Sequence, residues 1–152
     1  MKSSTYYIKE KLIIKKNKTA NYKYFPESKE ELKDIILQRI EDEGNEVDLN
    51  DIDVSTITDM SNLFEYLDFN GNISNWNVSN VTDMALMFFN CEFFNQDISK
   101  WDVSSVTDMS EMFYRCFKFN KDISKWDISN LDENRYMFKD CPIEEKYKPK
   151  YK

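Results

Sequence analysis

The stretch 95–129, NQDISKWDVSSVTDMSEMFYRCFKFNKDISKWDIS, uses the word D-I-S-K-W-D twice, and the word W-x-V-S-x-V-T-D-M at 101–109 also occurs at 76–84. The same spacing holds for single residues. The tryptophans Trp76, Trp101 and Trp126 are 25 residues apart. Two further series keep this step: Phe88, Phe113, Phe138 and Cys91, Cys116, Cys141. Such a period predicts a repeat architecture, in which each unit buries its apolar side chains against the next unit.

An earlier copy begins near Ile52, which takes the tryptophan position, and this copy is one residue shorter. We therefore expect about four coils over 52–141, starting near residues 52, 76, 101 and 126. Three other segments flank them. Residues 1–26 are expected to form two extended segments or a β-hairpin, 27–51 a capping helix with a linker, and 142–152 a charged tail that frays.

Each coil is expected to hold one strand and one helix. The spacing I-x-x-W-x-V at 98–103 matches the leucine-rich-repeat pattern L-x-x-L-x-L, which predicts a short W-x-V strand with Trp101 and Val103 pointing inward. In the next word, Thr107 or Asp108 is expected to cap a helix. Its apolar stripe is Met109, Met112, Phe113 and Cys116. The fold class predicted is an α/β repeat, a leucine-rich-repeat-like solenoid.

Stacking of equal coils predicts ladders of equal side chains. The asparagines Asn70, Asn95 and Asn120 are expected to hydrogen-bond the backbone of the neighbouring coil. The cysteines are expected to be buried, reduced and inert, although stacked thiols could also lie close enough for a disulfide.

A capping helix is expected before the repeats. Ser28-x-x-Glu31 has the form of a capping box, an apolar stripe runs through Leu32, Ile35, Ile36 and Ile40, and Gly44 ends the segment.

Charge is unevenly distributed along the chain. Residues 26–99 hold seventeen acidic and three basic residues, a net charge of −14. This argues against a direct nucleic-acid contact there, whereas a basic protein surface would be attracted. The alternative reading is an ordinary solvated acidic surface.

Stacked carboxylates such as Asp53, Asp102 and Asp127, or Asp59, Asp83 and Asp108, could hold calcium or act as an acid–base pair. A repeat produces such ladders automatically, and the chain has no histidine. We therefore predict no catalytic residues, no metal site and no cofactor, and the protein is not expected to be an enzyme.

The words F-N-x-D-I-S-x-W-D-V-S-x-V-T-D-M-S-x-M-F-x-x-C closely resemble the repeat of the BspA-like leucine-rich-repeat surface proteins of bacteria, over roughly 52–141. The resemblance implies a short right-handed solenoid that contacts other macromolecules, often at a cell surface, without catalytic residues or cofactor.

The leading functional prediction is a non-enzymatic protein-binding module that uses a polar face along the predicted strands. That face, the predicted strand face, consists of Asn75, Asn77, Ser79, Lys100, Asp102, Ser104, Lys125, Asp127 and Ser129. Tyr22, Tyr24, Tyr114 and Tyr136 are candidate exposed anchors. The alternative is an acidic inhibitor that blocks a basic, nucleic-acid-binding surface of a partner.

No apolar run is long enough to span a membrane, and the first residues lack the apolar core of a secretion signal. A cytoplasmic location is therefore expected, or the cell surface if a leader has been removed.

Overall fold

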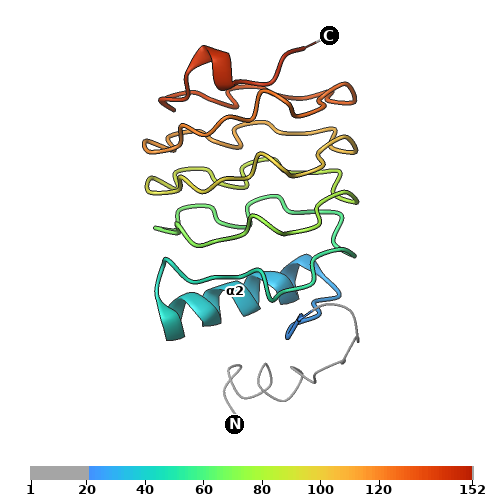
Figure 1. Cartoon of the computed structure of the whole chain (residues 1–152), viewed down its shortest axis with the longest axis vertical. Helices are drawn as coiled ribbons and strands as arrows, with labels where there is room; N and C mark the ends of the chain where they lie inside the picture. Colours follow the sequence, from blue (N-terminus) through green and yellow to red (C-terminus); the bar gives the residue numbers. More distant parts are fainter. Residues whose placement is uncertain (1–20, 152) are drawn as a thin grey trace.

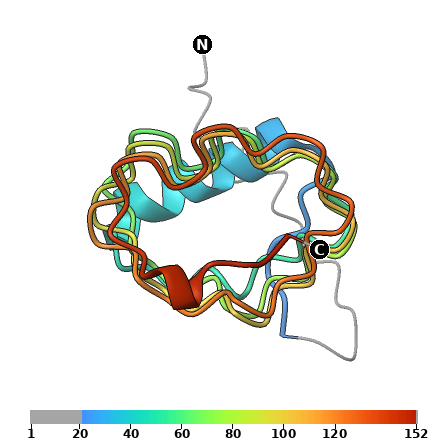
Figure 2. The same ribbon diagram turned by 90° about the horizontal axis from the view of Figure 1, so that it is seen from above.

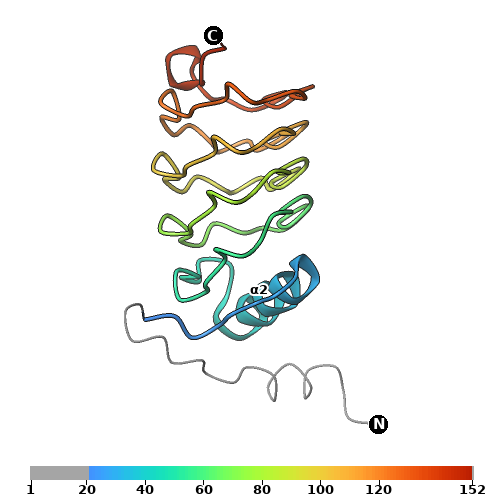
Figure 3. The same cartoon turned by 90° about the vertical axis from the view of Figure 1, so that its right-hand side faces the viewer.

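The computed structural model describes residues 21–151, so the hairpin predicted within 1–26 lies almost entirely outside the described residues. Helix α2 (Lys29–Glu43) precedes four irregular coils, and a short 3-10 helix, η1 (Glu145–Tyr147), follows them. The coils lie over one another along the long axis, with α2 across one end and η1 at the other (Figures 1 and 3). We number them coil 1 (52–75), coil 2 (76–100), coil 3 (101–125) and coil 4 (126–141).

The capping helix is confirmed. Ser28 is the N-cap, and its Oγ accepts a hydrogen bond from the backbone N–H of Glu31 at 3.1 Å. Gly44 follows the last turn with a φ of +90°, where L-residues with a side chain are rarely found. Leu32, Ile35 and Ile36 are buried in the same hydrophobic core as the coils, so α2 covers the apolar end of coil 1.

The predicted α/β leucine-rich-repeat-like solenoid is wrong. Within residues 21–151 there are two helical segments, α2 and η1, and no β-strand. The W-x-V triplets alternate inward and outward as expected, since Trp101 and Val103 are buried while Asp102 is exposed. They form no backbone hydrogen bonds to one another in the described part of the chain. Each is instead part of a bend, in which the N–H of Trp101 donates to the carbonyl of Ile98.

The predicted helices of the repeats are also wrong, because that segment pairs with its neighbours. In coil 2 the N–H of Leu86 donates to Ser110 and the N–H of Phe88 to Met112, at 2.9 and 3.0 Å. Isolated parallel bridges join Asp59, Asp83, Asp108 and Glu133 in succession. The intervening N–H groups close tight turns, as that of Met87 does onto Met84.

Coil spacing gives the physical reason why helices cannot form there. Rings of successive coils are 5.6 Å apart for Phe88 and Phe113, whereas packed helices need about 8–10 Å between axes. A left-handed backbone conformation recurs twice per coil and interrupts any helical run. The residues that adopt it are Asn62, Tyr66, Leu86, Asn90, Glu111, Arg115, Tyr136 and Asp140.

The bends of each coil are made by the word Asp-x-Ser or its variants Asn-x-Ser and Asp-x-Ala, and three such words occur in each of coils 1 to 3. In coil 3, Oδ1 of Asp102 accepts from the backbone N–H of Ser104 (3.1 Å) and from its hydroxyl (2.6 Å). Asp97 with Ser99 and Asp108 with Ser110 form the same local bond. These Asx turns let the backbone change direction without glycine. The helix-cap role predicted for Asp108 is therefore replaced by a turn.

The core is a set of columns of identical side chains. The indole rings of Trp76, Trp101 and Trp126 are stacked at 6.5 Å, tilted by only 4° and 3°. Each indole N–H donates to a backbone carbonyl 27 or 28 residues earlier in the chain, as Trp101 does to Ile73 at 3.1 Å. Seen along the stack, the coils superpose almost completely (Figure 2). The predicted alignment of equivalent positions is thus confirmed, although the backbone elements are not those expected.

The asparagine ladder is also confirmed. The backbone N–H of Asn95 donates to Oδ1 of Asn70, and that of Asn120 to Oδ1 of Asn95, at 2.9 and 3.1 Å. Glu144 continues the series through its N–H to Asn120. A side-chain amide therefore supplies a hydrogen-bond acceptor between successive coils at this corner.

The expectation of a fraying tail is wrong for its described part, 142–151. Ile143 and Pro149 are buried, and the carbonyl of Tyr147 accepts from the N–H of Ile123 at 3.0 Å. The tail thus covers part of the open end of coil 4, with Lys148 Nζ lying 5.6 Å from the ring centre of Phe138.

Candidate functional site: the outer surfaces of the stack

The predicted strand face runs from the end of coil 1 to coil 4, so its nine residues are brought together as rows. Asn75, Lys100 and Lys125 are exposed and form one row. Asn77, Asp102 and Asp127 are exposed and form the next. No strand underlies these rows, so we call this surface the polar face from here on.

Most polar groups of the polar face are already bonded within the chain. Oδ1 of Asn77 accepts from Ser79, and Oδ1 of Asp127 accepts from the N–H of Ser129. Hydrogen bonds from Ser104 hold the pKa of Asp102 below its usual value. The face therefore presents ordered carboxylates and two lysines, with little hydroxyl or amide capacity left for a ligand.

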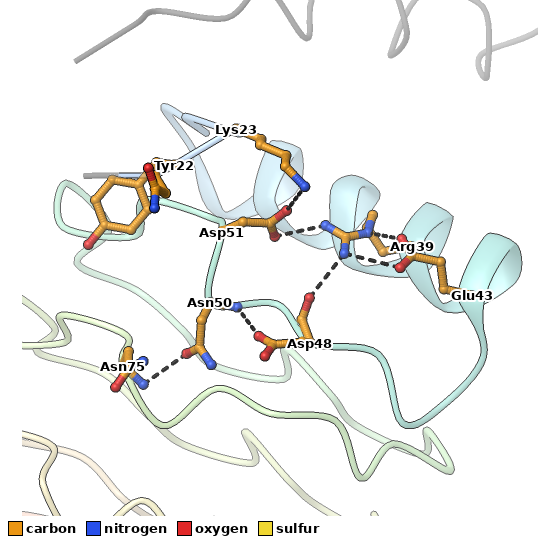
Figure 4. Close-up of a pocket in the computed structure, with 9 residues that line it drawn as sticks. Tyr22, Lys23, Arg39, Glu43, Asp48, Asn50, Asp51 and Asn75 are labelled. Atoms are coloured by element: carbon orange, nitrogen blue, oxygen red, sulfur yellow. Dashed lines mark hydrogen bonds and ion pairs between the residues drawn. The ribbon is translucent and has the colours of Figure 1, made fainter. Parts of the chain in front are cut away.

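A polar pocket of about 550 Å³ lies where segment 21–23, α2 and segment 48–51 meet (Figure 4). Its centre is Arg39, whose guanidinium donates to Asp51 Oδ1 at 2.8 Å, to the carbonyl of Asp48 at 3.0 Å and to the carboxylate of Glu43. Lys23 adds an ion pair to Asp51 at 3.3 Å.

The charged groups of this network are paired with one another. Burial opposes the charge of Arg39, but its hydrogen bonds to Glu43 and Asp51 outweigh that effect and raise the pKa of the guanidinium. The guanidinium lies 5.2 Å from the ring centre of Tyr24, which adds a cation–π contact. Arg39 and its partners thus join α2 to segment 44–51, which leads into coil 1, and we assign the pocket a structural role.

The cysteines are free thiols on the inner side of the coils. Cys91 and Cys116 are buried, and Cys141 is half-buried. Each thiol donates to a backbone carbonyl, as Cys116 does to Phe88 at 3.0 Å. Burial raises the pKa of Cys91 to about 12 and that of Cys141 to about 11, and it raises the pKa of Cys116 as well. These are properties of core cysteines, as predicted.

The aspartate ladders do not gather into a metal site. Within residues 21–151, no group of three or more Asp, Glu or Cys side chains is placed to hold one ion. In Asp59, Asp83 and Asp108, Oδ1 already accepts a hydrogen bond from the backbone N–H two residues later.

A row of aromatic side chains on the outside of the stack is the feature that the sequence patterns missed. Tyr66 and Phe89 meet edge to face at 5.4 Å, and Phe89 stacks on Tyr114 at 4.9 Å. Lys139 Nζ continues the row, 5.5 Å from the ring of Tyr114 and 5.0 Å from that of Tyr136. We call Tyr66, Phe89, Tyr114 and Tyr136 the aromatic row; none of them belongs to the core.

The signal for this row was present in the sequence. Phe89 and Tyr114 each follow a column phenylalanine, in the words M-F-F and M-F-Y. Of the four predicted anchors, Tyr136 is well exposed at 57%, whereas Tyr22, Tyr24 and Tyr114 are half-buried. Tyr66, exposed at 65%, was not among them because its counterpart in coil 2 is Asn90, so no aromatic residue repeats at its position.

The outer side of α2 is acidic because its cations are turned toward coil 1. Lys29 Nζ reaches Asp59 Oδ2 and Ser61 Oγ, both at 2.8 Å, and Lys33 donates to the carbonyl of Asn62. Arg39 is buried. The acids left exposed are Glu30, Asp34, Glu41, Asp42 and Glu43.

No helix within residues 21–151 is long and apolar enough to cross a membrane. Neither the curated proteins nor the solved structures include a match to this chain. A family model described as "Mycoplasma protein of unknown function, DUF285" matches residues 33–149, which include most of α2, all four coils and most of the tail. The chain therefore belongs to this Mycoplasma family of unknown function.

Proposed function

We propose that the protein is a non-enzymatic protein-binding module that uses the aromatic row as its main contact surface. Four rings in line on the surface of a stack form an apolar strip with both edges in water, and such strips are frequent protein-binding sites.

The side chains of the aromatic row are held in fixed positions, which supports the proposal. Ring contacts at 4.9 and 5.4 Å and the cation between Tyr114 and Tyr136 hold the side chains in place before a partner arrives. Less side-chain entropy is then lost on association. Aromatic side chains also contribute a large contact area for few rotatable bonds.

The polar face is the weaker candidate because its groups are engaged in Asx turns. Its exposed lysines and aspartates suit the rim of an interface, where charges affect the association rate more than the affinity.

The experiment compares three forms of the immobilised full chain in a lysate of the cells that produce it. One carries Tyr66→Ser, Phe89→Ser and Tyr114→Ser; the matched control carries Asp102→Lys and Asp127→Lys on the polar face. Far-ultraviolet circular dichroism first checks that all three are folded. We expect a specific partner, identified by mass spectrometry, to be retained by the control and lost by the aromatic variant. Equal recovery by both variants would exclude the aromatic row, and loss in the control alone would assign binding to the polar face.

A second candidate function rests on the acidic outer side of α2. We propose as the alternative that this side docks on a basic surface of a partner protein and blocks it, for example against nucleic acid. Exposed charges are screened by salt, so affinity for a purified partner should fall steeply between 50 and 300 mM salt, roughly the range in which the screening length becomes shorter than 10 Å. A flat salt response, or undiminished binding by Glu41→Gln with Asp42→Asn, would refute it.

A further inference from the structure

On the side of coil 4 that faces away from coil 3, backbone N–H groups are left without the acceptors that a further coil would supply. In coil 3, four alternate N–H groups donate to coil 4 at 2.8–2.9 Å; the donors are Met109, Glu111, Phe113 and Arg115. Their counterparts in coil 4 are Asn134, Tyr136, Phe138 and Asp140. Within residues 21–151, these four N–H groups form no hydrogen bond. We call them the donor edge.

The apolar side chains beside the donor edge are incompletely covered. Leu131, Phe138 and Cys141 are half-buried. Their counterparts one coil earlier, Val106, Phe113 and Cys116, are at most 1% exposed. The tail covers this side only in part. Lys148 Nζ lies 5.6 Å from the ring centre of Phe138, and Asn134 Nδ2 donates to the hydroxyl of Tyr151. Between these contacts the tail runs from η1 across the ring of the coils instead of following the outline of coil 4 (Figure 2).

The opposite end of the stack is closed. Helix α2 lies across coil 1, where Met60, Leu63 and Phe64 are fully buried. Lys33 donates to the carbonyl of Asn62 on that edge. The apolar side chains of coil 1 are therefore covered at that end, whereas those of coil 4 beside the donor edge are only half-buried.

We propose that the donor edge binds an extended segment of another protein, which adds to the stack as a further layer. The segment supplies backbone carbonyls at alternate positions to the N–H groups of Asn134, Tyr136, Phe138 and Asp140. Its inward side chains are apolar at the spacing M-x-x-M-F and cover Leu131, Phe138 and Cys141.

The chemistry of the edge selects this occupant. Four donors at every second residue match the carbonyls of a polypeptide backbone, and addition of a segment to an open edge is an established mode of peptide recognition. The neighbouring coils show the required side chains, since the same interface inside the stack is filled by Met and Phe columns.

The test uses the full chain and a labelled synthetic peptide that copies residues 104–118, SSVTDMSEMFYRCFK. In the protein, this segment gives the carbonyls of Asp108, Ser110 and Met112 to coil 2. We expect saturable binding by fluorescence anisotropy. We also expect slowed hydrogen exchange at the amides of Tyr136 and Phe138, measured by NMR, with no change at Leu86, which is already bonded to Ser110.

Two ester-containing peptides form a matched pair. Replacing the amide after Ser110 by an ester weakens a carbonyl that faces the donor edge, and binding should fall about fivefold, the effect of one ordinary hydrogen bond. An ester after Thr107 weakens a carbonyl that faces away from the edge, and it should leave binding unchanged.

Absence of binding, binding without protection at Tyr136 and Phe138, or equal effects of the two esters would each overturn the proposal. So would a dimer of the free protein in sedimentation that protects the same amides, because the occupant would then be a second copy. The result is separable from the proposed function: Tyr66→Ser with Phe89→Ser alters the aromatic row and should leave peptide binding intact.

Discussion

At the residue scale, short-range polar bonds replace the secondary structure that the apolar pattern suggested. Asp97, Asp102 and Asp108 each accept a hydrogen bond from the N–H two residues later, and each therefore fixes one bend, the first at the end of coil 2 and the other two in coil 3. Hydrogen bonding to Ser99 and Ser104 lowers the pKa of Asp97 and Asp102, so these bends are formed by the ionised side chains. Repeated words in this chain thus specify corners of a coil as much as core positions.

Gly71 gives a prediction about close backbone approach. A Cβ placed on Gly71 would lie 2.1 Å from the carbonyl oxygen of Val47, which belongs to the segment between α2 and coil 1. Gly71→Ala should therefore lower the free energy of unfolding by about 2–3 kcal/mol, as overpacked cores do. Urea unfolding measures this. The control is Lys121→Ala at the equivalent position of coil 3, expected within about 0.5 kcal/mol; equal losses would contradict the account.

The thiols give a prediction about reactivity. Burial raises the pKa of Cys141 to about 11, so at pH 8 its thiolate fraction is roughly a hundredfold below that of an ordinary cysteine. Ellman's reagent should react with the native protein at least about a hundredfold more slowly than with the urea-unfolded chain. Cys141 should react first because it is only half-buried. Fast native labelling of Cys91 or Cys116 would contradict the placement of the cysteines.

At the scale of elements, α2 is the one regular element of the described chain long enough to act as a lid, and its attachment depends on Arg39. The guanidinium joins Glu43 of the helix to Asp51 and Asp48 of the next segment. Lys29 and Lys33 fasten the start of α2 to coil 1.

Removal of the central cation should be costly. Arg39→Met keeps the apolar stem but leaves Asp51 with only Lys23, and we expect a loss of about 2–3 kcal/mol in unfolding free energy, somewhat less than for a fully buried pair. Lys23 is 71% exposed, so Lys23→Met should change stability by no more than about 0.5 kcal/mol. Equal, small effects of both substitutions in urea unfolding would show that the network does not fasten α2.

Sequence patterns were sufficient to predict α2 and the columns of stacked side chains. They were insufficient to predict the backbone structure of each coil. Ser28, Gly44 and the stripe of Leu32 are local signals, so the helix could be read directly. The stripe Met109, Met112, Phe113 has helical spacing, yet the 5.6 Å distance between columns leaves no room for a helix. That distance is a property of the stack and cannot be read from one repeat. The aromatic row was not predicted for a related reason. Tyr66 does not share the repeat position of Phe89 and Tyr114, and it lies beside Phe89 only in the folded stack.

At the scale of the whole molecule, stability is distributed along one dimension, because each coil contacts only its neighbours and the core is continuous through all of them. The phenylalanine column runs from coil 1 to coil 4 and the tryptophan column from coil 2 to coil 4. Helix α2 and the tail cover the two ends of the stack to different extents.

Deletion of one repeat tests this organisation. Removing residues 101–125 joins Lys100 to Trp126 and preserves every column, so the shortened protein should remain folded and unfold cooperatively at a lower temperature. Removing 101–123 instead joins Lys100 to Ser124 and places polar residues in the columns. This control should be unfolded by circular dichroism. Two equally folded deletions would contradict the dependence on exact repeat length.

The most direct measurement of the central claim is the set of NMR scalar couplings transmitted through hydrogen bonds from backbone nitrogen to carbonyl carbon. The stacked coils predict couplings from Leu86 to Ser110, from Phe88 to Met112 and from Glu111 to Arg135. A helix in each repeat would instead couple Phe113 to Met109 within the same coil, and that result would contradict the account.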